Sequence, residues 1–251
     1  AFVANDDDPD KLYLNDGTGQ FTDSGQVFPN VDSHAVVSGD LNADGHPDIV
    51  VGEEDANTVR IYLNDGSGNL VDINLDTGIN SANNDAIGLA LEDFDGDGDL
   101  DVFALIDQLG ILVPKDDQLW LNDGAGNFTL GGTGLLLSDP NGMKAGDLDG
   151  NGTIDIAISW GAGQIDSIDE ISFMLNDGAG NFSLAPQTIT GKRDVFALFD
   201  VDQNGTLDMV AQGNQGELWL NDGTSTFTQA PDSDLLFVSG ATIGDYNGDL
   251  L

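Results

Sequence analysis

Four stretches of nine residues place oxygen-bearing side chains at a spacing that suits a metal ion. Asp40–Asp48, Asp93–Asp101, Asp147–Asp155 and Asp200–Asp208 each have Asp at position one, Asp or Asn at three and five, Gly at six and Asp at nine. Ca²⁺ takes about six to eight oxygen ligands, and a Gly permits the sharp turn around the ion. The spacing therefore predicts four Ca²⁺ sites, with the shorter match Asp245–Asp249 as a candidate fifth.

The ligands that we assign are the side chains at positions one, three, five and nine and the main-chain carbonyl at position seven. The side chain at position seven varies without pattern, so the imidazole of His46 is not assigned. Asp and Gly also gather in β-turns for conformational reasons alone, but four stretches with uncompensated carboxylates favour a metal. The full set is Asp40, Asn42, Asp44, His46 (carbonyl), Asp48, Asp93, Asp95, Asp97, Asp99 (carbonyl), Asp101, Asp147, Asp149, Asn151, Thr153 (carbonyl), Asp155, Asp200, Asp202, Asn204, Thr206 (carbonyl), Asp208, Asp245, Asn247 and Asp249.

A second motif alternates with these stretches along the chain. Leu-Asn-Asp-Gly occurs five times, and the first residues of successive Asp-rich stretches are separated by 53, 54, 53 and 45 residues. Two motifs that keep the same order over five cycles indicate an internal repeat. The Asn residues of the second motif are Asn15, Asn64, Asn122, Asn176 and Asn221.

Each repeat is expected to form four short strands. In the second repeat they are Ala35–Ser38, Asp48–Gly52, Val59–Leu63 and Leu70–Ile73, with the Asp-rich stretch after the first strand and the Asn-Asp-Gly turn after the third. Units of this length with four strands are typical of β-propeller blades. The fold class that we predict is all-β, a β-propeller of four-stranded blades.

We expect one domain over residues 1–251, with five blades closed into a ring by pairing of the N- and C-terminal strands. The alternative is that the chain is part of a seven-bladed propeller or of a longer array. The predicted repeats span about 1–33, 34–80, 81–139, 140–190 and 191–236, and residues 237–251 complete the first blade.

Composition argues against several classes of partner. The formal net charge is −39, which repels phosphate backbones and anionic lipid surfaces, so we expect neither nucleic acid binding nor membrane insertion. The chain has no Cys, has His34 and His46 as its two His residues, and lacks a Gly-x-Ser-x-Gly motif. We identify no catalytic constellation and expect the protein not to be an enzyme.

The Asp-rich stretches resemble the FG-GAP/VCBS repeat family, which includes the integrin α-subunit propeller and many secreted bacterial proteins. Asp93–Asp101, with Asp-x-Asp-Gly-Asp-Gly-x-x-Asp before a hydrophobic strand, has the fullest match. The resemblance implies Ca²⁺ in each stretch and an extracellular location, secreted or at the cell surface. Integrin-type propellers have seven blades, whereas we count five repeats.

The connections between second and third strands vary in length, while the Asp-rich stretches and turns stay nearly constant. In a propeller these connections lie on the face opposite the metal loops, and binding residues commonly lie on such loops. Residues with a candidate role in ligand binding are Trp160, Gln164, Lys115, Lys192 and Arg193. The interpretation that we favour for Trp160 is packing of a loop, and for Lys192 and Arg193 it is a local salt bridge to Asp. We expect a calcium-stabilised, lectin-like or protein-binding adhesion module. The alternatives are a domain of a calcium-containing polysaccharide lyase and a structural segment of a large adhesin or surface filament.

Overall fold

The computed structural model of the chain describes residues 1–29, 31–54, 59–73, 75, 84–108, 117–131, 140–160, 169–191, 194–212 and 216–231. These residues form β-strands and turns and contain no helix, so the predicted all-β class is confirmed for them. None of the described residues therefore belongs to an apolar helix of membrane-spanning length. The chain divides into two compact units, Ala1–Asp93 with Asp97–Leu137 and Phe94–Gly96 with Ser138–Leu251.

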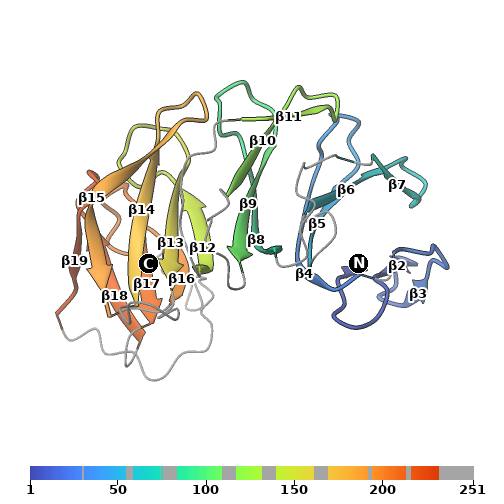
Figure 1. Cartoon of the computed structure of the whole chain (residues 1–251), viewed down its shortest axis with the longest axis horizontal. Coiled ribbons are helices and arrows are strands. Elements are labelled where there is room, and N and C mark those ends of the chain that lie inside the picture. Colours follow the sequence, from blue (N-terminus) through green and yellow to red (C-terminus); the bar gives the residue numbers. More distant parts are fainter. Residues whose placement is uncertain are drawn as a thin grey trace. The chain divides into compact units, whose positions relative to one another are not determined.

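The first unit contains one three-stranded and two four-stranded antiparallel sheets (Figure 1). The strands are β1 (Phe2–Val3), β2 (Lys11–Asn15) and β3 (Phe21–Asp23) in the first sheet, β4 (Ser33–Gly39), β5 (Asp48–Glu53), β6 (Val59–Asn64) and β7 (Leu70–Asp72) in the second, and β8 (Asn84–Glu92), β9 (Asp101–Gln108), β10 (Gln118–Asn122) and β11 (Phe128–Leu130) in the third.

The second unit contains two four-stranded antiparallel sheets. The strands are β12 (Pro140–Gly146), β13 (Asp155–Trp160), β14 (Glu170–Asn176) and β15 (Phe182–Thr190) in one sheet, and β16 (Asp194–Phe199), β17 (Asp208–Gln212), β18 (Gly216–Asn221) and β19 (Phe227–Gln229) in the other.

Within every sheet the strands lie side by side in chain order, as expected for a succession of hairpins. Each complete Asp-rich stretch joins the first strand of a sheet to the second, and each Asn-Asp-Gly turn joins the last two strands. The strands predicted for the second repeat form as β4–β7, with ends that differ from the prediction by up to two residues. Local turn chemistry therefore sets the boundaries of these strands.

Alternate residues of the strands fill hydrophobic cores on both faces of the sheets. In the first unit, Ile61 of β6 contributes to one core, while its neighbour Tyr62 packs in another core with Phe2 and Phe28. In the second unit, Phe173 of β14 stacks on Phe227 at the start of β19, with 4.5 Å between ring centroids. Within each unit, this burial holds neighbouring sheets together.

Candidate metal centres

The first and sixth positions of the Asp-rich loops are linked in the same way in all four complete copies. The backbone N–H of the Gly at position six donates to Oδ2 of the Asp at position one, over 2.8 Å for Gly45 and Asp40 and over 2.9 Å for Gly152 and Asp147. The other two copies have distances of 3.0 and 2.9 Å. These glycines have φ between +86° and +97°, a conformation that side chains disfavour. The predicted turn at position six is thus present.

The Asp at position nine is buried in each complete loop and accepts backbone N–H groups. Oδ2 of Asp155 accepts from the N–H of Leu148 at position two over 2.8 Å, and Oδ1 accepts from the N–H of Asn176 in the following turn over 2.8 Å. Asp48 and Asp208 have the same two kinds of bond. This carboxylate therefore ties the loop to the turn between the last two strands of its own sheet.

Positions one, three and nine bring their carboxylates together. In three loops one oxygen from each of these three acids lies within 4.8 Å of the others; the groups are Asp93, Asp95 and Asp101, Asp147, Asp149 and Asp155, and Asp200, Asp202 and Asp208. The members of each group belong to nine consecutive residues, so the grouping is a property of the loop itself. The remaining loop has the neutral Asn42 at position three and so lacks the third acid.

Position five carries an oxygen that accepts the N–H of position seven. Oδ1 of Asp44 accepts from His46 over 2.8 Å, and Oδ1 of Asn151 accepts from Thr153 over 2.7 Å. The imidazole of His46 lies over Gly66 of the next turn, where a Cβ would collide with it. The side chain of His46 therefore packs against the turn, and the assignment of its main-chain carbonyl as a ligand stays a prediction.

The donor set of these loops suits a hard divalent cation. Burial raises the pKa of Asp155 to about 6, opposed by its two backbone hydrogen bonds and reinforced by the charges of Asp149 and Asp147. Burial also raises the pKa of Asp48. Convergent carboxylates without a counterion disfavour ionisation, and a cation with oxygen affinity would reverse this effect. The residues present thus fit Ca²⁺.

Position four of the loops takes a left-handed conformation that the sequence reasoning missed. Ala43 and Gln203 have φ of +56° and +59°, and the glycines at the same position have φ of +80° for Gly96 and +75° for Gly150. The two glycines at this position were the available signal. In the other two loops a side chain occupies a conformation that costs free energy.

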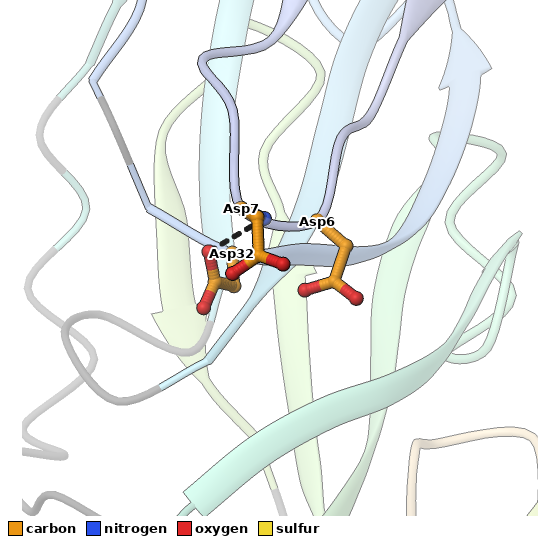
Figure 2. A group of neighbouring side chains, drawn as sticks. All are labelled: Asp6, Asp7 and Asp32. Atoms are coloured by element: carbon orange, nitrogen blue, oxygen red, sulfur yellow. Dashed lines mark hydrogen bonds between the residues drawn. The ribbon is translucent and has the colours of Figure 1, made fainter.

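A further acidic group lies outside the Asp-rich loops. One oxygen from each of Asp6, Asp7 and Asp32 lies within 4.8 Å of the others, and the N–H of Asp7 donates to Oδ1 of Asp32 over 3.0 Å (Figure 2). Asp6 and Asp7 follow β1, and Asp32 precedes β4. The run of three Asp at positions 6–8 was a visible signal, but its partner lies more than twenty residues away in sequence.

The first unit also contains a buried ion cluster that the sequence reasoning missed. The guanidinium of Arg60 donates to both carboxylate oxygens of Glu53, over 2.6 and 3.2 Å, and to Asp72 over 2.6 Å. Asp10 is 3% exposed, and burial raises its pKa despite bonds from the N–H of Asn5 and from Ser33. No regular spacing joins these residues, because four separate segments contribute them.

The residues with a candidate role in ligand binding are only partly described. Trp160 is buried at the end of β13, and its Nε1 has no hydrogen-bond partner among the described residues. Lys115, Gln164, Lys192 and Arg193 lie outside the described residues, as do the fifth-loop residues Asp245, Asn247 and Asp249. The roles predicted for these residues stay predictions.

Comparison with known proteins supports the repeat assignment. Residues 1–51 and 40–104 match the family model of the FG-GAP-like repeat. The second match begins at Asp40 and so includes two of the Asp-rich loops with the strands around them. No curated protein matches the chain. Residues 1–104 therefore match repeats of the FG-GAP type, and the Asp-rich loops Asp147–Asp155 and Asp200–Asp208 lie beyond the matched residues.

Proposed function

We propose that the protein is a secreted or cell-surface binding module, stabilised by Ca²⁺, that recognises a protein or carbohydrate ligand in adhesion. The observation that carries the calcium assignment is the convergence of the acids at positions one, three and nine in three loops of the same construction. The FG-GAP-like repeat, which is typical of extracellular proteins, supports the location. Extracellular Ca²⁺ suits sites of modest affinity.

The fold that we propose for this function is a five-bladed propeller in one domain. The first sheet has three strands, and β2, like the third strand of each other sheet, is followed by an Asn-Asp-Gly turn, so β1 corresponds to the second strand of those sheets. A first strand beside β1 would complete this sheet. We assign residues 237–251 to that position, which lies outside the described residues. The rival arrangement is part of a seven-bladed propeller.

Calcium in this proposal is a structural element. Bound Ca²⁺ would neutralise the carboxylates and fix the loops through its oxygen ligands. The acids at positions one, three and nine hold the ion, with positions five and seven as further ligands. Asp155 and its counterparts also fix the loop to the adjacent turn, so ion binding would stiffen the end of each sheet that has a complete loop.

The ligand would bind on the face opposite the metal loops, where the connections between second and third strands lie. Trp160, at the end of β13, is 7% exposed, and its indole N–H has no hydrogen-bond partner among the described residues. This N–H is the group of Trp160 that we propose donates to the ligand. We propose recognition without turnover, because the chain has no Cys, has two His residues and shows no recognisable catalytic motif.

A glycan array probed with the purified chain, in Ca²⁺ and in excess chelator, tests the proposal. Trp160→Phe removes the indole N–H and should reduce binding, whereas Trp120→Phe, whose Nε1 bonds Gln118 over 3.1 Å inside the fold, is the matched control. Binding that requires Ca²⁺ and falls only in the Trp160 variant is the expected result for a carbohydrate ligand. Release of unsaturated products from an acidic polysaccharide would refute the non-enzymatic role and favour the lyase.

A further inference from the structure

The Asn of the Asn-Asp-Gly turn uses both protons of its side-chain amide. Nδ2 of Asn221, a residue that is 2% exposed, donates to the carbonyl of Leu207 over 3.0 Å and to the carbonyl of Leu148 over 2.9 Å. Leu207 is position eight of the loop in the same repeat. Leu148 is position two of the loop in the preceding repeat. One side chain therefore bridges two Asp-rich loops within the second unit.

The same bridge recurs at two other buried turn residues. Nδ2 of Asn122 donates to the carbonyl of Leu41 over 2.7 Å and to Leu100 over 3.0 Å. Nδ2 of Asn176 donates to the carbonyl of Phe94 over 2.8 Å and to the carbonyl of Ile154, in the loop of its own repeat, over 3.1 Å. The same amide nitrogen makes the same pair of bonds at three turns, so the connection is a regular feature of these repeats.

Asn64 bonds the loop of its own repeat in the same way. Its Nδ2 donates to Pro47 of its own repeat over 3.1 Å, and among the described residues it has no bond to another Asp-rich loop. Asn64 is also partly exposed, unlike the three bridging residues. The loop that would precede Asn64 in the proposed ring, Asp245–Asp249, lies outside the described residues, so Asn64 serves as a control for its own loop alone.

Position two is the point at which such a bridge can control a metal loop, because it lies between ligand positions one and three. The N–H of Leu148 is held by Oδ2 of Asp155 over 2.8 Å. Its carbonyl accepts from Asn221 and also from the N–H of Ser225 over 3.0 Å. Both the N–H and the carbonyl of Leu148 are therefore held, and the carbonyl is held by residues of the next repeat. The flanking acids Asp147 and Asp149 take their positions from this backbone.

We infer that the buried turn asparagine is a positioning residue for two calcium loops, its own and that of the preceding repeat; the inference rests on the proposed calcium sites. Replacement by Asp keeps the shape but removes both donors and sets a carboxylate oxygen against the two carbonyls. Loss of groups that orient metal ligands commonly weakens metal binding by about 10–100-fold. Asn221→Asp should therefore weaken two loops, not one.

The test is a Ca²⁺ titration of the ¹⁵N-labelled chain followed by NMR. The N–H of each position-six glycine donates to the position-one carboxylate, so each signal reports its own loop. In Asn221→Asp the midpoints for Gly205 and Gly152 should rise about 10-fold or more, while Gly45 stays unchanged. In the control Asn64→Asp, only the midpoint for Gly45 should rise.

The variant Met174→Ala separates a general loss of stability from a loss of loop positioning. This change truncates a buried side chain of β14 in the second unit that makes none of the bridging hydrogen bonds, so the Gly152 midpoint should not change. If Asn221→Asp does not fold, Asn221→Ser, which loses the second donor without adding charge, should raise the same two midpoints. An unchanged Gly152 midpoint in the folded variant overturns the bridge alone. Wild-type glycine signals that ignore Ca²⁺ overturn the calcium assignment as well.

Discussion

Replacement of Arg60 by Met should strongly destabilise the first unit. The side chain of Arg60 is 12% exposed and pairs with Glu53, whose side chain is 1% exposed, through two hydrogen bonds of 2.6 and 3.2 Å. The same guanidinium holds Asp72 at 2.6 Å. Met has a similar length and is apolar, so the variant keeps most of the packing and loses the charge. Removing one partner of a buried pair costs about 3–5 kcal/mol of unfolding free energy.

The loss should depend on pH, because the remaining carboxylates can take up protons. Burial raises the pKa of Glu53, and the hydrogen bond and charge of Arg60 oppose that rise. Without Arg60 the pKa of Glu53 rises further. An acid whose pKa is higher in the folded state than in the unfolded state binds its proton more tightly in the folded state. Its contribution to the stability of the protein is therefore fully present below its pKa in the unfolded chain, and it is lost as the pH increases through its pKa in the folded protein. The variant should thus recover part of its stability in acid.

Urea unfolding of wild type and Arg60→Met, with Ca²⁺ present at about pH 7.5 and about pH 4.5, measures both effects. The matched control is Lys11→Met, which removes the exposed pair of Lys11 and Asp23 at 3.1 Å and should change stability little at either pH. A loss below about 1 kcal/mol at the higher pH, or an equal loss at both values, would refute the reasoning about buried charge.

Three other predictions concern the loops and a close contact. Ala43→Gly should raise the unfolding free energy by about 0.5–1 kcal/mol, because Ala43 is exposed with φ of +56°; a lower melting temperature would contradict this. Gly52→Ala should cost about 1–3 kcal/mol in urea unfolding, since its Cβ would collide with the carbonyl of Ala86, and a neutral result would count against the packing. Because the pKa of Asp155 is about 6, protons should compete with Ca²⁺, so the midpoint of the Ca²⁺ titration at Gly152 should rise as pH falls below that value. Without Ca²⁺, ionisation of Asp155 should lower the unfolding free energy as pH rises through about 6. A Gly152 midpoint that is independent of pH would contradict the role of Asp155.

Features that depend on neighbouring residues could be predicted from the sequence. The strands around Asn64 end within two residues of the expected positions, because an Asn-Asp-Gly turn dictates its own conformation. The left-handed glycine at position six and the convergence of positions one, three and nine also follow from loop spacing. These are local properties of nine consecutive residues.

Features that join distant segments could not be predicted in the same way. The pairing of Arg60 with Glu53 depends on the register of two strands and on the burial that follows from it. The bond from Asn221 to Leu148 joins residues 73 positions apart, although the recurrence of the turn asparagine was visible in the sequence. The repeat motif identifies Asn221 as a recurring residue, but its bond to Leu148 depends on how one sheet packs against the next.

The most direct test of the structural role of calcium is thermal unfolding of the chain in excess Ca²⁺ and in excess chelator. An ion that binds the folded state alone stabilises it by about 2.7 kcal/mol per site when its concentration is about 100 times the dissociation constant. The melting temperature should therefore fall sharply in chelator and return when Ca²⁺ is restored. Identical melting curves in the two conditions would contradict the account.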